Sequence, residues 1–386
     1  MKGKFGLLPR IIVAITLGVL LGLVVPKLVV EIAATFNGIF NGFLSFVVPF
    51  IIIAFIVPGI AQLGKGSGKL LGISTGVAYV STLVAGVIAF FVSSNLLPSL
   101  IGGKEVMEIE NPEEFLVSGL FEMPMEPLMD VMTALIFSFI MGIGISATNS
   151  QSLKKGFDEF STIIEKIIST IIIPLLPFHI FGIFLNMSYG GQVAKILSVF
   201  GVVFVMVIAI HLFMLLLQYT TAGTMTGKNP LKLLKTMSPA YFTALGTQSS
   251  AATIPVTLKQ ARLTGASKKV TDFTVPLFAT IHLSGSAITL ISCSIGVMLL
   301  NGQEVALSTY IPFIFMLGLT MIAAPGVPGG AVMAALGLLD TMLGFNGAML
   351  GLMIALYIAQ DSFGTATNVT GDGALAIIVD KFSGEK

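Results

Sequence analysis

The sequence predicts an all-α polytopic membrane protein with eight transmembrane helices and two re-entrant hairpins. Three observations carry this prediction. The 386 residues are 55% hydrophobic and only 10% charged, whereas soluble domains carry about 25% charged residues. Eight apolar runs are long enough to cross a membrane, which takes about 20 apolar residues. Basic residues lie in alternate loops between these runs, as they do in the cytoplasmic loops of membrane proteins.

The predicted spans follow one another along the chain and are separated by polar loops or by loops that contain Gly or Pro. They cover residues 8–29, 38–62, 72–98, 128–149, 160–187, 194–221, 270–300 and 345–380. The first run is too long for the apolar core of a signal peptide and lacks a small-residue cleavage site. We therefore expect it to remain in the protein as a membrane span.

Charge sets the expected orientation of the spans. Basic residues precede the first span, recur in alternate loops and follow the last span: Lys2, Lys4, Arg10, Lys65, Lys69, Lys154, Lys155, Lys228, Lys232, Lys235, Lys381 and Lys386. The loop at 101–127 instead contains seven glutamates. Because basic loops face the cytoplasm, we expect both termini there, in a multi-pass protein of the cell (inner or plasma) membrane.

Two further stretches are semi-apolar and are interrupted by Gly, Pro and small polar residues. Residues 236–257 have Lys235 before them and Lys259 after them, so both ends are expected in the cytoplasm and "GTQSSAATIP" is the tip of a hairpin. Residues 306–338 lack basic flanks, which favours a second hairpin from outside with "APGVPGG" at its tip. Inverted pairs of broken helices are typical of secondary transporters.

The last span carries acidic residues on one face. At 100° per residue, Asp361, Thr365, Asn368 and Asp372 fall on the same side of a helix. A charge at the membrane centre costs about 2.5–17 kcal/mol, and no Lys or Arg occurs in this span before Lys381. We expect the compensating charge to be a ligand: an ammonium group, a metal cation or a proton. The alternative is pairing with Lys166 or Lys195 on another helix.

Four motifs carry a family resemblance. The stretches are "TQSSAATIPVT" (247–257), "PLFATIHLSGSAIT" (276–289), "APGVPGG" (324–330) and "DSFGTATNVTGD" (361–372). In this order they resemble the dicarboxylate/amino acid:cation symporters, which include glutamate transporter homologues and serine/threonine symporters. The resemblance implies a homotrimer with an elevator mechanism. Residues 1–70 and 101–190 would form the scaffold, and residues 71–100 and 191–386 the sliding transport domain.

The resemblance also implies site residues. Asp361 would bind the substrate α-ammonium group, and Asn368 and Ser250 would bind its α-carboxylate. The whole expected substrate set is Ser250, Ser286, Gly326, Val327, Asp361, Gly364, Thr365 and Asn368. The expected sodium ligands are Tyr79, Thr82, Phe278, Thr280, His282, Asn368 and Asp372. Sodium ions are the expected coupling ions, with no organic cofactor.

Departures from the family pattern bear on specificity. Gly364 stands where members that carry acidic amino acids have Arg, and Gln248 also offers no cation. A buried carboxylate without a partner is costly, so we expect a small neutral substrate such as serine, threonine or alanine. His282 and Ser284 stand where the family has Asn and Asp. Proton coupling, or fewer sodium ions, is therefore an open alternative, as is His282 serving only as a neutral hydrogen-bonding replacement for Asn.

Other functions fit the sequence less well. A proton-coupled symporter, or a symporter of dicarboxylates or other organic solutes, would share this fold. An aspartyl intramembrane protease needs two acids that converge from different helices, whereas Asp361 and Asp372 share one. A serine protease could use Ser250 and His282, and a channel would need a continuous polar lining. We expect that the protein is not an enzyme and does not bind nucleic acid. The expected partners are a small-molecule substrate and the lipid bilayer.

Overall fold

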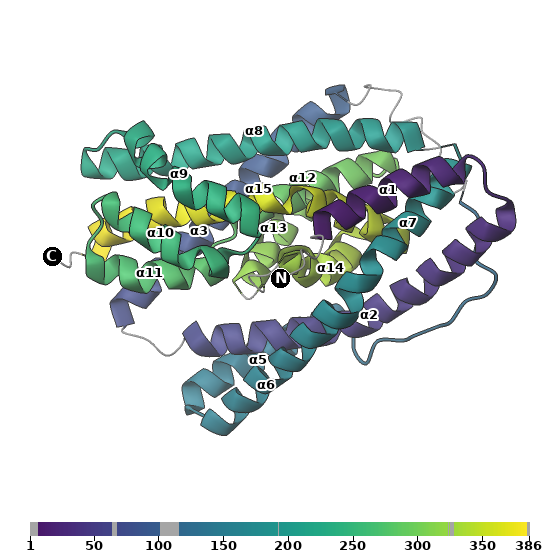
Figure 1. Cartoon of the computed structure of the whole chain (residues 1–386). Coiled ribbons are helices and arrows are strands. Elements are labelled where there is room, and N and C mark those ends of the chain that lie inside the picture. The colour runs from purple at the N-terminus through teal and green to yellow at the C-terminus, as the bar shows by residue number, and fades with distance from the viewer. Residues whose placement is uncertain are drawn as a thin grey trace, which may run out of the picture.

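The computed structural model describes residues 7–63, 68–100, 116–191, 193–322, 324 and 328–383, and every regular element in these ranges is helical (Figure 1). The first helices in chain order are α1 (Leu7–Gly22), α2 (Lys27–Leu63), α3 (Gly68–Leu100), α5 (Val131–Thr148), α6 (Gln151–Ile167), the π-helical turn η2 (Ile168–Ile172) and α7 (Ile173–Tyr189). They are followed by α8 (Val193–Thr226), α9 (Pro230–Thr247), α10 (Ser250–Leu263), α11 (Lys268–Ile281), α12 (Ser284–Leu300), α13 (Leu307–Met321), α14 (Gly330–Leu343) and α15 (Gly347–Ser383). The predicted all-helical class is confirmed.

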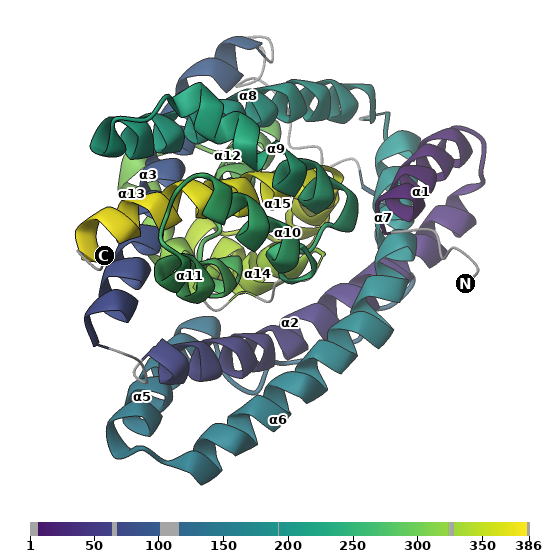
Figure 2. The ribbon, with the colours of Figure 1, turned by 60° about the vertical axis from the view of Figure 1, so that its left-hand side comes forward.

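The helices form a central bundle and an outer arm (Figure 2). The central bundle consists of α3 and α8 to α15, and α15 lies inside it, packed against α3, α8, α9, α10, α11, α12 and α14. The outer arm consists of α1, α2, α5, α6, η2 and α7; within it, α1 packs on α7, and α2 packs on α5, α6 and α7. The arm contacts the bundle through α15 and α14. The polar stripe on the last helix is therefore enclosed by the other helices of the bundle.

Six helical segments of the described residues are long and apolar enough to cross a membrane. They are Lys27–Ala61, Lys69–Leu100, Gln151–Tyr189, Ile196–Thr226, Lys268–Leu300 and Gly347–Ser383. The apolar parts of α1 and α5 are shorter, at Pro9–Gly22 and Ile136–Thr148. Six of the eight predicted spans thus reach full length, and the other two are short apolar helices.

The predicted end of the first span is wrong. α1 ends at Gly22, seven residues before the predicted limit of 29, and α2 begins at Lys27 rather than near 38. Pro26 explains the difference: it lacks an N–H group and disfavours helical conformation in the residue before it. The backbone therefore turns between Leu23 and Pro26 and starts the next helix at once.

Both predicted hairpins contain two helices that follow each other in the chain. In the first, α9 ends at Thr247 and is followed by Gln248, which adopts a left-handed conformation with φ 53°; the Ser249 hydroxyl then accepts a hydrogen bond from the Ala252 N–H to begin α10. In the second, α13 ends at Met321 and α14 begins after Gly329, which has φ 73°. A positive φ is accessible to glycine at little cost, so Gly329 suits the tip of the hairpin.

The predicted span at 270–300 is broken in the middle. α11 ends at Ile281, the next residue His282 is extended with φ −109° and ψ 100°, and α12 starts at Ser284. The first turn of α12 lies very close to α15, because a Cβ added to Gly285 would be 2.4 Å from the Gly364 carbonyl oxygen. The break brings backbone N–H groups and the His282 side chain to the polar face of α15.

Candidate functional site

The four polar residues expected on one face of the last helix are all buried in α15: Asp361, Thr365, Asn368 and Asp372. Neither aspartate forms an ion pair with a lysine or arginine among the described residues. Lys166, one of the alternative partners considered, is exposed to the surface. The side chain of Lys195, the second alternative partner, lies outside the described part of the structure.

Asp361 is held by the tip of the second hairpin. Its Oδ2 accepts a hydrogen bond from the Gly329 N–H at 2.7 Å. Gly329 immediately precedes α14, and the N-terminus of a helix favours negative charge. One turn before Asp361, the buried Tyr357 hydroxyl has no hydrogen-bond partner of normal geometry among the described residues. This end of the site therefore places the Asp361 carboxylate and the Tyr357 hydroxyl side by side, next to a hairpin tip.

Asn368 holds the start of α12. Its Oδ1 accepts hydrogen bonds from the Gly285 N–H at 2.7 Å and the Ser286 N–H at 3.4 Å, and its Nδ2 donates to Ser286 Oγ at 3.0 Å. Both ends of the Asn368 amide are thus used within the protein. The predicted substrate residues Asn368 and Ser286 are brought together by these bonds.

Asp372 is paired with a side chain of the broken helix. Asp372 Oδ1 lies 2.8 Å from His282 Nδ1, and His282 Nε2 lies 3.1 Å from Ser81 Oγ on α3. Gln218 on α8 donates from Nε2 to Ser81 Oγ at 3.0 Å and to Ser284 Oγ at 3.3 Å. The predicted sodium ligands Asp372 and His282 are thus brought together, but as hydrogen-bond partners of each other.

Sequence reasoning missed Ser81 and Gln218, and it also missed His211. His211 Nε2 lies 2.9 Å from the Gly285 carbonyl oxygen and 3.2 Å from Thr289 Oγ1. A signal was present, because His211 and Gln218 are seven residues apart in α8, two turns on one face of the span with the highest mean hydropathy, 2.9. Polar residues in such a span mark a functional site by default.

Several predicted sodium ligands use their hydroxyls elsewhere. Tyr79 donates to the Phe315 carbonyl on α13 at 3.3 Å, and Thr82 donates to the Ala78 carbonyl of its own helix at 3.0 Å. Thr280 is exposed and donates to the Leu277 carbonyl at 2.7 Å. Phe278 is buried, and its carbonyl accepts the His282 N–H at 2.9 Å. The side chains of these four residues make no hydrogen bond to the Asp372–His282 pair.

The remaining predicted substrate residues lie on α15 and at the hairpin tips. A Cβ added to Gly364 would lie 3.5 Å from Thr289 Oγ1, an ordinary contact, and Gly364 itself faces Gly285. Ser250 is buried at the start of α10, which packs against α15. Gly326 and Val327 lie outside the described residues.

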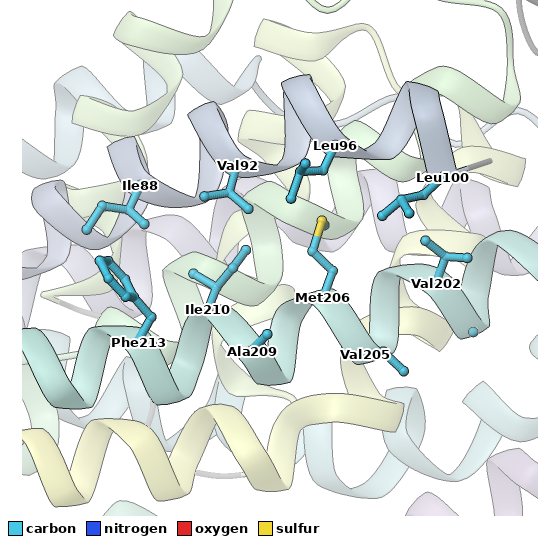
Figure 3. A pocket seen from close by; sticks show the side chains of 11 residues that line it. Ile88, Val92, Leu96, Leu100, Val202, Val205, Met206, Ala209, Ile210 and Phe213 are labelled. Carbon is cyan, nitrogen blue, oxygen red and sulfur yellow. The ribbon is translucent and has the colours of Figure 1, made fainter. Parts of the chain in front are cut away.

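A large apolar groove lies away from this polar stripe. It runs between α3 and α8, has a volume of about 610 Å³ and is lined only by apolar residues, such as Ile88, Val92, Leu96 and Phe213 (Figure 3). A zwitterionic amino acid needs charged or polar partners, since unpaired buried charges are costly. We therefore exclude this groove as the amino acid site and place the candidate site at the face of α15.

Comparisons with known proteins agree with this architecture. The model of the sodium:dicarboxylate symporter family matches residues 7–382. Over 258 residues the chain is 30% identical to excitatory amino acid transporter 1 of Homo sapiens, covering 66% of this chain and 46% of that protein. Over 266 residues it is 28% identical to an excitatory amino acid transporter of Caenorhabditis elegans, covering 66% and 51%. The chain spans about half the length of the curated relatives it matches.

The family comprises elevator-type transporters and not enzymes. Its sodium coupling is a property of the family as a whole. The match covers the outer arm and the central bundle alike, since it begins in α1 and ends in α15. The chain belongs to the sodium:dicarboxylate symporter family.

Proposed function

We propose that the protein is a secondary active symporter that moves a small neutral amino acid across the membrane together with sodium. The observation that carries this proposal is Asp361. It is buried within a spanning helix, has no lysine or arginine partner among the described residues, and is bonded to the backbone of a hairpin tip. Such a carboxylate suits the α-ammonium group of an amino acid, which would supply the missing positive charge.

The other groups of the site suit the rest of an amino acid. Ser250 begins α10, and the N–H groups at the start of a helix favour a carboxylate. Thr365, one turn after Asp361, and the Tyr357 hydroxyl, one turn before it, offer further hydrogen bonds. Asn368 would contact the α-carboxylate if the substrate displaces one of the hydrogen bonds between the Asn368 amide and the start of α12. The expected contacts of Gly326 and Val327 belong to the same proposal.

The neutral side chain is inferred from Gly364. The space that a side chain at this position would fill is bordered by Thr289 Oγ1 and the Gly285 backbone, so the nearest groups are a hydroxyl and backbone and none is a cation. A substrate carboxylate would be buried there without a partner, which is unfavourable, whereas a hydroxyl or methyl group is compatible. The named relatives are transporters of excitatory amino acids, so the neutral class rests on Gly364 and on Gln248, neither of which offers a cation.

The hydrogen bond between Asp361 and Gly329 links substrate binding to the second hairpin, which we propose opens and closes the site. When the substrate ammonium group binds Asp361, it changes the environment of the hairpin tip that the same carboxylate holds. Sodium can drive this change only if the substrate binds more tightly in its presence, because a ligand shifts an equilibrium by its differential affinity. We therefore expect substrate affinity to rise with sodium concentration.

The remaining parts of the proposal concern the assembly. The outer arm corresponds to most of residues 1–70 and 101–190, and we propose that it is the scaffold of a homotrimer. The central bundle would be the transport domain that slides against it. The arm and the bundle meet mainly at α15 and α14, which is compatible with such a movement. Both termini would face the cytoplasm.

The test is uptake of a panel of labelled amino acids into liposomes containing the purified protein. Sodium and proton gradients are imposed separately, at equal membrane potential. We expect serine, threonine or alanine to accumulate under a sodium gradient. Accumulation of acidic amino acids alone would contradict the neutral class, and accumulation under a proton gradient alone would favour the proton-coupled alternative.

A further inference from the structure

The two aspartates of α15 do not offer equivalent sites for a cation. Asp372 Oδ1 is bonded to the imidazole of His282, which is buried with an exposed fraction of 1%. The other ring nitrogen is 3.1 Å from Ser81 Oγ. Both nitrogens of the ring are thus engaged, and the ring is fixed between α15 and α3.

A second layer of hydrogen bonds holds this arrangement. Gln218 on α8 donates to Ser81 Oγ and to Ser284 Oγ, and so joins α8 to α3 and to the start of α12. We call the five residues Ser81, Gln218, His282, Ser284 and Asp372 the histidine network. It connects four parts of the bundle around the break between α11 and α12.

The network also lies close to the neighbouring Gly371. A Cβ added to Gly371 would lie 2.6 Å from Gln218 Oε1 and 2.9 Å from His282 Cε1. The Gln218 amide and the His282 ring therefore occupy the space beside the α15 backbone at Gly371. An ion bound between Asp372 and the ring would have to break the hydrogen bond that joins them.

The chemistry of the network also opposes a sodium ion. Hard cations prefer several oxygen ligands, whereas the atom facing Asp372 Oδ1 is an imidazole nitrogen that donates a hydrogen bond. Ser284 adds a neutral hydroxyl, which accepts a bond from Gln218.

We propose that His282 takes the place of a sodium ion at Asp372, so that Asp372 does not bind sodium in this chain. This inference rests on the proposed sodium-coupled transport, and it predicts that the coupling sodium binds without Asp372. It further predicts that removing the imidazole recreates a sodium site that depends on Asp372.

The test is a cycle of four purified proteins: the wild type, His282→Asn, Asp372→Asn and the double variant. Thermal unfolding is followed with a thiol-reactive dye, because the single cysteine, Cys293, is buried and reports unfolding. Melting temperatures are compared in sodium chloride and in choline chloride at equal ionic strength, without any amino acid. A ligand that binds only the folded protein raises its melting temperature.

We expect the wild type and Asp372→Asn to show the same sodium-dependent shift. His282→Asn should show a larger shift, by about 2 °C or more, and the double variant should lose this gain. Loss of the wild-type shift in Asp372→Asn, or equal shifts in the wild type and His282→Asn, would overturn the inference. Because no substrate is present, a failure of the neutral amino acid proposal leaves this result unaffected.

A milder variant covers the case in which His282→Asn does not fold. Ser81→Ala removes the shorter of the two contacts of His282 Nε2, which also lies 3.4 Å from Gln218 Nε2, and should give a gain in sodium-dependent stabilisation of the same sign. Ser74→Ala is the control, because Ser74 is a buried serine of the same helix, α3, whose hydroxyl bonds to the Leu70 carbonyl of its own helix. Equal sodium responses of Ser81→Ala and Ser74→Ala would count against the inference.

Discussion

The two ends of the polar stripe on α15 differ in what holds their carboxylates. Asp361 is bonded to the backbone N–H of Gly329 on the second hairpin, whereas Asp372 is bonded to the His282 side chain inside the bundle. Gly329 belongs to the connection between α13 and α14 alone, whereas the histidine network joins α3, α8, α12 and α15. The comparison indicates that Asp361 is available to a ligand and that Asp372 is a fixed part of the structure.

The largest expected effect comes from breaking the fixed end. His282→Ala leaves the buried Asp372 without its partner, and removing one member of a buried pair costs about 3–5 kcal/mol. The melting temperature of the purified protein in sodium-free buffer measures this loss. The control is Asp272→Asn, which breaks the exposed ion pair between Asp272 and Arg262; an exposed pair is worth only about 0–1 kcal/mol. Similar losses in the two variants would mean that the histidine network is not a structural unit.

At the other end, Asp361→Asn should remove substrate binding while preserving the fold. Losing the charge that pairs with a buried ammonium group costs about 3 kcal/mol, or roughly 100-fold in affinity. Calorimetry with the best substrate of the uptake panel measures the change. Asp340→Asn serves as the control, because Asp340 is an exposed carboxylate on α14 outside the stripe. A variant at Asp361 that still binds within a few-fold of the wild type would refute the proposed ammonium contact.

A cationic side chain at position 364 tests whether this position selects neutral over acidic substrates. Gly364→Arg should admit acidic amino acids, because a charge-assisted hydrogen bond is worth about 2 kcal/mol, or roughly 30-fold. Competition by aspartate and glutamate against uptake of the neutral substrate is the measurement. Gly364→Met adds a long side chain without charge and should only weaken uptake. Equal inhibition of Gly364→Arg and Gly364→Met by aspartate and glutamate would contradict the proposed role of position 364.

The smallest expected effect concerns the hairpin tip. Gly329→Ala places a side chain at φ 73°, and Gly344→Ala does the same at φ 70° at the other end of α14; each should cost about 1 kcal/mol in stability. Among the described residues that are not chain neighbours, none has an atom within 4 Å of a Cβ added to Gly344, and Ile358 atoms lie 3.9 Å from one added to Gly329. Only Gly329→Ala should also lower substrate affinity, by about 5-fold, since its N–H holds Asp361. Equal substrate affinities in the two variants would show that the hairpin tip does not contribute to substrate binding.

The parts of this architecture that depend on local patterns could be predicted from the sequence. The helical period alone places Asp361, Thr365, Asn368 and Asp372 on one face, and the basic flanks of residues 236–257 alone indicate a hairpin. The end of the first span was missed although Pro26 marks it, because the apolar run continues through the turn.

The histidine network could not be predicted in the same way. Its members come from α3, α8, the break after α11, and α15, and no local period relates Ser81 or Gln218 to His282. The break itself depends on the close approach of Gly285 to α15, which is a property of the packed bundle. The sequence therefore indicates which residues are polar within the membrane, but not which of them become each other's partners.

The most direct test of the central claim is whether the substrate amine binds Asp361. Sodium-driven uptake of the preferred amino acid is competed by an analogue in which a hydroxyl group replaces the amine, in the wild type and in Asp361→Asn. We predict that the analogue does not compete with uptake by the wild type and that the variant transports neither compound. Competition by the analogue in the wild type at concentrations similar to those of the amino acid would contradict the account.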